Sequence, residues 1–205
     1  MEKLKSILYK FTGSVYLPPE LINSNETFII HISDTPICFY NALSILLKKL
    51  LPAYIIHTGD LVDNLKLQFA PNQTPRYERD VKFLLNILEA SSAKEIYITL
   101  GNHDRVEIVQ RIAKRSTILE NASIINIQGI ELMISHYASD LINSNCYFNL
   151  YGHDLSLPNY KVTDNNYLNG ITSINVIAIE SQRVFKLLYP FGTDDMRLKK
   201  GKIGL

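Results

Sequence analysis

Three short apolar runs rich in β-branched residues, each followed by a segment long enough for a helix, constrain the fold of this 205-residue chain most strongly. Runs of this kind are typical of strands buried in a sheet, and the longer amphipathic segments are typical of helices that cover it. The pattern predicts strands at residues 27–33, 53–58 and 95–100, and helices at residues 37–50, 77–90 and 105–114. Strands and helices that alternate in this way favour a parallel sheet with crossover helices.

After about residue 116 the pattern changes to strand-like runs separated by short Gly, Asn and Ser turns. An α/β half followed by a β-rich half predicts an α/β (α+β) fold class, with two sheets packed face to face and helices outside. We expect a single domain over residues 1–205, because no linker composition separates the halves. Residues 1–26, which begin with a short amphipathic helix, are expected to form an extension, and residues 191–205 a polar tail.

Composition excludes several classes of protein. A net charge of +1 with 20% charged residues gives no electrostatic case for nucleic acid or for a membrane surface. No apolar run approaches the roughly 20 residues needed to span a bilayer. The two cysteines, Cys38 and Cys146, form no CxxC pair, so a disulfide framework is not expected and a reducing cytoplasm is the simplest location.

Polar residues follow five of the expected strands at the point where each strand ends. Because the carboxyl ends of strands in open α/β sheets are where ligands bind, we expect these side chains to share one centre. Asp, Asn and His together suit manganese, iron or zinc. A glycine precedes the polar residue in three cases and is expected to let the backbone turn sharply. The strand ends are Asp34, Gly59-Asp60, Gly101-Asn102-His103-Asp104, His136 and Gly152-His153.

The motifs GDLVD, GNHD, a strand ending in a lone His, and GH, in that order after an Asp, resemble those of the calcineurin-like metallophosphoesterases. The resemblance runs from Asp34 to His153. It implies a four-layer α/β/β/α sandwich of two mixed sheets flanked by helices, with two metal ions bound between the sheets. It also implies hydrolysis of a phosphomonoester or phosphodiester by attack of a metal-bound hydroxide on phosphorus.

The resemblance assigns metal ligands residue by residue. Asp60 matches the carboxylate that bridges both metals. Asn102, His136 and His153 match the other ligands of one metal position, and Asp34 matches the carboxylate of the other.

Two further residues of the GNHD motif match catalytic positions of the family. His103 matches the histidine that faces the substrate phosphate and the leaving group, and Asp104 is expected to orient it. Asp104 followed by Glu107 also fits a helix cap, and the two roles are compatible.

The chain departs from the family at two positions. The family's D-x-H motif is Asp34-Thr35-Pro36 here, and its G-H-x-H motif is Gly152-His153-Asp154-Leu155. Both missing histidines serve the same metal, so we expect one firmly held ion and one weak position. Manganese is the first expectation for the firm position, with iron or zinc as alternatives, and Mg²⁺ or Mn²⁺ suits the weak one. Pro36 cannot be a ligand but is a good start for the following helix.

Several polar residues also have structural interpretations. His31 and His57 lie within strands and are expected to be packed core histidines. Asp63 and Asn64 fit a turn, and the resemblance implies that Asp63 braces the loop after Asp60. Cys146 is expected to be a small buried apolar residue.

The substrate is the least constrained part of the prediction. The segment 64–80 follows the Asp60 motif and is expected to border the cleft. Arg76, Arg79 and Arg105 are candidates for binding a phosphate, although each also fits an ordinary surface position. The expected partner is therefore a small-molecule or phosphorylated substrate.

Two function classes remain open: a metal-dependent phosphoesterase, and a catalytically weak or inactive scaffold that keeps the fold for binding partners. The GNHD motif favours the enzyme, because a scaffold has no chemical need for His103 and Asp104 beside four retained ligands.

Overall fold

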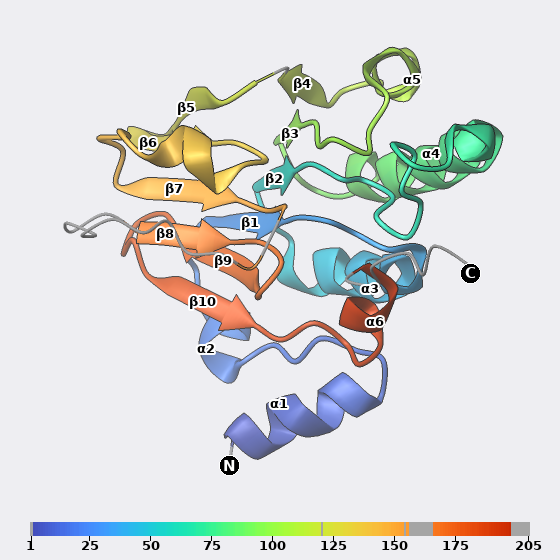
Figure 1. Cartoon of the computed structure of the whole chain (residues 1–205). Coiled ribbons are helices and arrows are strands. Elements are labelled where there is room, and N and C mark those ends of the chain that lie inside the picture. Colours follow the sequence, from blue (N-terminus) through green and yellow to red (C-terminus); the bar gives the residue numbers. More distant parts are fainter. Residues whose placement is uncertain (1, 120, 154, 156–165, 198–205) are drawn as a thin grey trace.

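Two β-sheets packed face to face form the centre of the molecule in the computed structural model (Figure 1). The structure describes residues 2–119, 121–153, 155 and 166–197. In chain order, the elements before the second sheet are α1 (Glu2–Phe11), α2 (Pro19–Ile22), β1 (Phe28–Ile32), the 3-10 turn η1 (Ile37–Phe39), α3 (Tyr40–Leu50), β2 (Tyr54–Thr58), η2 (Pro71–Gln73), α4 (Thr74–Glu89), β3 (Glu95–Thr99), α5 (Val106–Ile112) and β4 (Thr117–Leu119). They are followed by β5 (Ser123–Ile127), β6 (Ile130–Ile134), η3 (Ala138–Leu141), β7 (Phe148–Tyr151), β8 (Asn166–Asn169), β9 (Ile174–Ala178), β10 (Val184–Leu187) and α6 (Thr193–Arg197).

The larger sheet has six strands in the order β10-β9-β1-β2-β3-β4. Strands β1 to β4 are parallel neighbours, in a register that places Ile32 beside His57 and His57 beside Ile98. Strands β9 and β10 then return to this sheet in antiparallel orientation, and β9 pairs with β1. The parallel strands therefore end together at one edge, where the loops after β1, β2 and β3 meet.

The smaller sheet has four strands in the order β5-β6-β7-β8. Strands β5 and β6 form an antiparallel hairpin closed by Gln128 and Gly129, which both have positive φ angles (51° and 87°), as two-residue hairpin turns require. Strands β7 and β8 add in parallel orientation.

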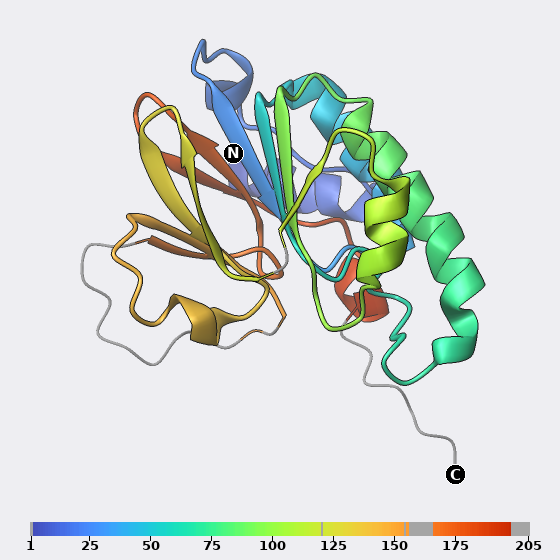
Figure 2. The same cartoon turned by 90° about the horizontal axis from the view of Figure 1, so that it is seen from above.

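Burial divides the core into two layers, one on each face of the larger sheet (Figure 2). Alternate residues of β1 point to opposite faces, so Ile30 and Ile32 pack against the helices while Ile29 packs against the smaller sheet. Helices α3, α4 and α5 cover the outer face of the larger sheet (Figure 2). The α4 helix contributes one apolar face to this core: Tyr77, Val81, Leu84, Leu85 and Leu88.

The segment around η3 packs on part of the outer face of the smaller sheet, over β7 and β8. The Tyr167 hydroxyl donates to the Leu141 carbonyl oxygen (3.2 Å), and Asn149 Nδ2 donates to the Cys146 carbonyl oxygen (2.8 Å). The layers therefore follow the predicted α/β/β/α order, with the fourth layer reduced in the described residues to this 3-10 turn and its flanks.

The structure corrects several predicted elements. Strands β9 and β10 were expected in the second sheet, but they complete the first, because β9 is buried along its whole length and covers the edge of β1. The second long helix begins at Thr74 rather than residue 77, so Arg76 and Arg79 lie in its first turns and not in a loop. Pro36 precedes η1, and this 3-10 turn leads directly into α3. The prediction that Pro36 starts the helix is therefore confirmed, with a 3-10 turn as the first turn.

The α1 helix lies lowest in the view of Figure 1. Part of the predicted tail is ordered, since α6 forms at Thr193–Arg197 and buries the Arg197 side chain. Residues 198–205 of that tail lie outside the described residues, and the single-domain prediction for residues 1–205 stays a prediction. Within the described chain, none of the helices has the length and apolarity needed to span a membrane.

Candidate metal centre

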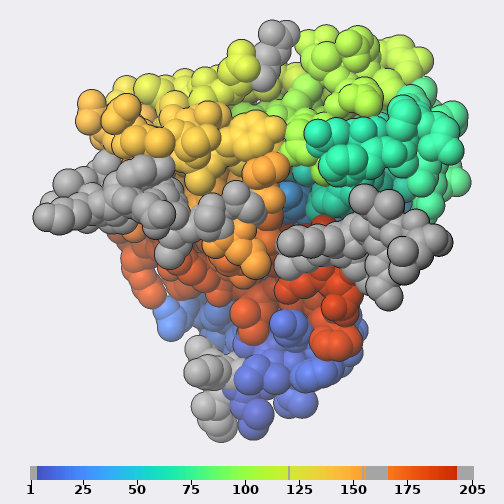
Figure 3. All heavy atoms as spheres, viewed as in Figure 1, coloured from blue at the N-terminus to red at the C-terminus, as the bar shows by residue number. Residues whose placement is uncertain are grey.

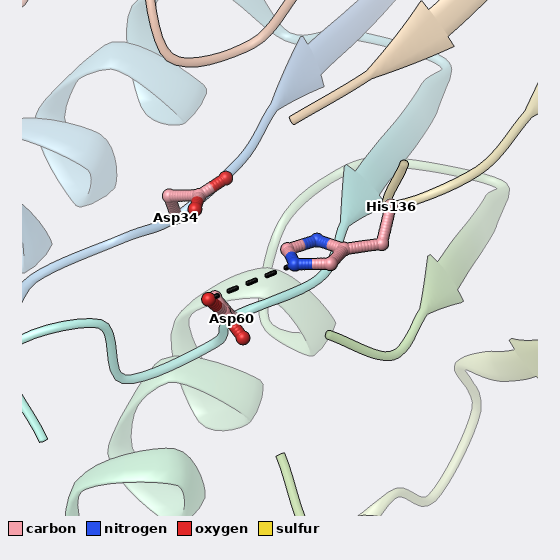
Figure 4. A group of neighbouring side chains, drawn as sticks. All are labelled: Asp34, Asp60 and His136. Carbon is pink, nitrogen blue, oxygen red and sulfur yellow. Dashed lines mark ion pairs between the residues drawn. The ribbon is translucent and has the colours of Figure 1, made fainter. Parts of the chain in front are cut away.

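The predicted strand-end residues come together where the two sheets meet. Potential ligand atoms of Asp34, Asp60 and His136 all lie within 4.8 Å of one another, and all three residues are buried (Figure 4). His136 Nε2 is 3.7 Å from Asp60 Oδ2. In the space-filling view, the surface is hollowed between the smaller sheet and the segment that follows β2, with early-chain atoms visible at the bottom (Figure 3).

Hydrogen bonds across the two sheets fix this meeting point. His136, after β6, contacts the carbonyl oxygen of Thr58 at the end of β2 through Nδ1 (2.7 Å). The backbone amide of His153, after β7, donates to Asp34 Oδ2 (3.1 Å). The smaller sheet therefore holds its two histidines against the carboxylates of the larger sheet.

Three of the predicted ligands have left-handed backbone conformations. The φ angles are 49° at Asp34, 53° at Asp60 and 68° at His153, a region that residues other than glycine rarely adopt. Non-glycine residues held in this region cost of the order of 1–3 kcal/mol each and cluster at functional sites. Hydrogen bonds between the loops hold this backbone conformation in place. For example, the Asp34 amide donates to the Gly59 carbonyl oxygen (3.0 Å).

At two of the three positions, the glycine before the ligand serves a purpose other than the expected sharp turn. Gly59 has a φ of +92° and fits the predicted sharp turn. Gly101 and Gly152 do not have positive φ angles, so close approach is what requires glycine there. A Cβ on Gly152 would lie 1.9 Å from Ser33 Oγ, and one on Gly101 would lie 2.2 Å from Asp60 Oδ1.

Potential metal-ligand atoms converge on one atom of His136. The ring donates through Nδ1 to a carbonyl oxygen that can only accept, so in the neutral ring Nε2 holds a lone pair. Nε2 nevertheless lies 3.2 Å from Asn102 Oδ1 and 3.2 Å from His153 Nδ1, in addition to its approach to Asp60. Asn102 is oriented by Nδ2, which donates to Gln68 Oε1 (3.0 Å), so its oxygen faces the site. A cation bound among these atoms would have an O/N donor set that suits Mn²⁺, Fe or Zn²⁺.

The second position is poorer in ligands. Asp34 Oδ2 accepts from Ser33 Oγ (2.5 Å) and from the His153 amide. Pro36 is buried at the start of η1, and the Leu155 side chain is 57% exposed. The four buried carboxylates nearby are close enough to influence one another: the pKa of Asp60 is raised well above its usual value, first by burial and then by the charges of Asp34, Asp104 and Asp63.

Asp104 does not orient His103 as expected. Its two carboxylate oxygens accept hydrogen bonds from three backbone amides and one phenol: Asp60 N (2.8 Å), Leu61 N (2.9 Å), Gly101 N (2.8 Å) and the Tyr77 hydroxyl (2.9 Å). These bonds use the carboxylate to clamp the loop after β2 to the loop after β3. Asp104 is therefore a positioning residue, and burial raises its pKa.

His103 lies beside a different carboxylate. Its backbone amide donates to Asp60 Oδ1 (3.0 Å), and ligand atoms of His103, Asp60 and Asp63 all lie within 4.8 Å of one another. Nε2 of the ring accepts from Asn102 Nδ2 (3.2 Å), whereas the buried Nδ1 has no hydrogen-bond partner in the structure. Burial, followed by the charge of Lys66, lowers the pKa of His103 to about 4, so the ring is neutral near pH 7.

Asp63 has a larger part in the site than a turn former. It is 2% exposed and forms an ion pair with Lys66. Burial and then the charge of Asp34 raise the pKa of Asp63 to about 7. Sequence reasoning did not single out Lys66 or Gln68, because neither belongs to a motif. The only signal was their position in the loop expected to border the cleft.

The three candidate arginines differ in whether they interact with the site. Arg76 Nε lies 3.7 Å from Asp80 Oδ2 with its side chain 53% exposed, and Arg79 pairs with the same carboxylate at 2.9 Å. Arg105 Nη2 donates to the Leu67 carbonyl oxygen (3.4 Å), and its charge contributes to the lowered pKa of His103. Of the three arginines, Arg105 is the one in electrostatic contact with the site.

The residues given structural interpretations behave as expected. His31 contacts Thr58 Oγ1 through Nε2 (3.0 Å), and His57 contacts Thr35 Oγ1 through Nε2 (3.0 Å). Both rings are fully buried, and burial lowers the pKa of each to about 3. Cys146 is buried, with 5% of its surface exposed.

A two-sheet sandwich with a cluster of Asp, Asn and His side chains at the edge where the sheets meet defines a metal-dependent phosphoesterase fold. The family model of the calcineurin-like phosphoesterases matches residues 29–196. The chain belongs to the calcineurin-like phosphoesterase family.

Among the solved structures that align with this chain, the first supports the fold alone. One crystal structure aligns with a TM-score of 0.58 at 8% identity, over 80% of this chain and 99% of that chain. The solution structure of the Thermotoga maritima protein TM1076 aligns with a TM-score of 0.47 at 19% identity, over 80% and 99% of the two chains. AQ665, a protein of unknown function from Aquifex aeolicus, aligns with a TM-score of 0.42 at 18% identity, over 70% and 89%. No curated protein matches the sequence.

Proposed function

We propose that this protein is a metal-dependent phosphoesterase that hydrolyses a phosphomonoester or phosphodiester, with one firmly held and one weakly held metal ion. The observation that carries the proposal is the convergence of potential metal-ligand atoms on His136 Nε2, since Asn102 Oδ1 and His153 Nδ1 each lie 3.2 Å away. Carboxylate, amide and imidazole atoms gathered this closely form an O/N donor set that suits a divalent transition metal.

The firm position would be held by Asp60, Asn102, His136 and His153, and the weak one by Asp34 together with Asp60. Manganese is the first candidate for the firm position, and iron or zinc would also fit the donors. When bound, the ions would supply Lewis acidity toward a phosphoryl oxygen and toward the attacking water.

His103 is proposed to bind the phosphate or the leaving group. Its ring lies beside the exposed Phe69, with a distance of 6.1 Å between the two ring centroids. A neutral ring with Nε2 accepting from Asn102 carries its proton on the buried Nδ1. Arg105 borders the same region, and a small-molecule or phosphorylated substrate is the proposed partner.

One residue, His103, distinguishes the enzyme from the scaffold alternative. Asp104 no longer discriminates between the two functions, because a scaffold would also need its clamp on the two loops. His103 does discriminate, since its buried Nδ1 makes no hydrogen bond that would support the fold. A scaffold would gain nothing from such a buried polar atom, so the enzyme is favoured.

The test is a metal analysis of the purified protein, combined with a screen of phosphomonoesters and phosphodiesters in added Mn²⁺. The control is His153→Ala prepared in the same way, because contaminating phosphatase activity would survive this change. Hydrolysis that follows the metal content and disappears in His153→Ala supports the proposal. Metal binding without hydrolysis of any ester would favour the scaffold.

A reducing compartment such as the cytoplasm is proposed as its location. Cys38 is exposed and Cys146 is buried, and both are free thiols. An exposed free thiol is at risk of oxidation outside a reducing environment.

A further inference from the structure

The cleft concentrates negative charge that one metal ion does not balance. Asp34, Asp60, Asp63 and Asp104 are each at most 8% exposed. Across the described residues, Lys66 is the one lysine or arginine that forms an ion pair with any of these four carboxylates. Buried charges require partners, because transfer out of water is costly. Lys66 is thus the protein's own counter-charge in the cleft.

Lys66 is attached to the side of the cleft where the metal ligands are missing. The Asp63 amide donates to the Thr35 carbonyl oxygen (3.1 Å), and the Ile37 amide donates to Asn64 Oδ1 (2.9 Å). The segment 63–64 therefore runs alongside residues 35–37 and flanks Pro36. The ion pair with Asp63 therefore anchors Lys66 to the loop that runs alongside Pro36, the residue that stands where the resemblance to the family implies a histidine ligand.

Lys66 also faces the group expected to meet the substrate. The link between Lys66 and His103 is Asp63, whose carboxylate forms the ion pair with Lys66. His103 and Asp63, the ion-pair partner of Lys66, both belong to the cluster whose ligand atoms lie within 4.8 Å of one another. The Lys66 side chain is 30% exposed, so its flexible stem can reach a ligand in the cleft.

We propose that the Lys66 ammonium takes the place of a tightly bound second metal, neutralising the carboxylates around Asp34 and binding a non-bridging oxygen of the substrate phosphate. A lysine at this position explains how the loss of two histidine ligands is compatible with phosphate binding. A resident cation also disfavours a second divalent ion by charge repulsion. The proposal rests on the proposed function, and it adds the residue that recognises phosphate on the metal-poor side.

The experiment compares Lys66→Met, Lys66→Arg and the control Lys82→Met, which changes an exposed lysine of α4 away from the cleft. Mn²⁺ binding is titrated by electron paramagnetic resonance. Removing the positive charge in Lys66→Met should tighten binding of a second Mn²⁺ on the order of tenfold, a coupling of the size usual between linked sites. Lys66→Arg keeps the charge and should resemble wild type, as should Lys82→Met.

Inorganic phosphate provides the second readout, measured by calorimetry on protein loaded with one equivalent of Mn²⁺. Lys66→Met should bind phosphate about tenfold more weakly, as expected when a charged hydrogen bond is lost. Lys66→Arg should retain most of the affinity. A purely structural lysine would lower the thermal midpoint of Lys66→Met while leaving both titrations equal to those of Lys82→Met, and that result would overturn the proposal.

Neither titration requires turnover, so the two proposals can fail separately. If Lys66→Met shifts both titrations but no ester is hydrolysed by wild type, phosphate recognition by Lys66 stands and the enzyme proposal fails. If wild type hydrolyses esters but Lys66→Met binds Mn²⁺ and phosphate as wild type does, only the role of Lys66 fails. Should Lys66→Met not fold, Lys66→Gln with the same two titrations decides the question.

Discussion

The two halves of the metal cluster are built from the same kinds of loops but differ in their ligands. On one side, Asn102, His153 and Asp60 each place a potential metal-ligand atom 3.2 to 3.7 Å from His136 Nε2. On the other side, Asp34 is joined by Pro36 and Leu155 in place of imidazoles, and a lysine pairs with the neighbouring Asp63. The comparison indicates that loops of similar construction can present a donor-rich side and a donor-poor side of one cluster.

The largest expected effect is loss of the firm metal in His136→Ala. Wild type purified without added metal should carry about one transition-metal ion per chain, and the variant close to none, because the acceptor cluster loses its central atom. The measurement is elemental analysis after dialysis, with thermal unfolding to check the fold. His57→Gln, which alters a buried histidine outside the cluster, is the control and should keep its metal. Full metal content in His136→Ala would mean that the ligand assignment is wrong.

The next effect separates metal binding from chemistry. His103→Ala should keep its metal but lose about 10²- to 10⁴-fold in hydrolysis, the usual contribution of a positioned acid–base group. The loss should be smallest for a nitrophenyl ester, whose leaving group needs little protonation. Equal losses for all leaving groups would assign His103 to phosphate binding instead. Unchanged activity in a preparation of proven activity would favour the scaffold.

The weak side can be rebuilt by combining Pro36→His with Leu155→His. The double variant should bind a second Mn²⁺ about tenfold more tightly than wild type in a calorimetric titration, and either single change should give much less, because one imidazole leaves the ion largely hydrated. Losing Pro36 should cost about 1 kcal/mol or less. Adding Lys66→Met should tighten the second site further if the ammonium opposes the ion. A folded double variant with wild-type affinity would show that residues 36 and 155 do not face the site.

The smallest expected effect is on the free energy of unfolding, through a hydrogen bond to Asp104, which holds the loops of the cluster together. Tyr77→Phe removes one hydrogen bond to the buried Asp104 carboxylate and should lower the free energy of unfolding by about 1.5–3 kcal/mol. Metal content should not change, because the three backbone amides still hold Asp104 in place. Denaturant unfolding measures the first quantity and elemental analysis the second. Loss of metal in this variant would place Asp104 in the binding machinery and not only in the support.

The sequence was sufficient to predict the strand ends and their meeting. Parallel strands with crossover helices must end at one edge, so Asp34, Asp60 and Asn102 could be brought together from their spacing alone. The return of β9 to the first sheet could not be predicted, because its apolar run fits the interior of either sheet and only pairing with β1, almost 150 residues earlier, decides between them.

The roles of individual side chains were harder to predict than their positions. Asp104 follows His103 directly, which suggested a partnership, but its carboxylate is used by amides of a loop more than 40 residues earlier in the chain. Lys66 lies outside every motif, and its contact with Asp63 depends on how the loop after β2 turns. Both depend on tertiary geometry that local patterns do not encode.

The left-handed backbone at Asp34, Asp60 and His153 sets stability against function in this protein. Glycine adopts this conformation without strain, and replacing either aspartate would also remove a like charge from a crowded, buried site. Asp34→Gly should therefore make the metal-free protein harder to unfold while it weakens divalent-ion binding. Selection for thermal stability alone would therefore favour loss of the proposed metal site. Any stabilised variant needs to be checked first at these three positions.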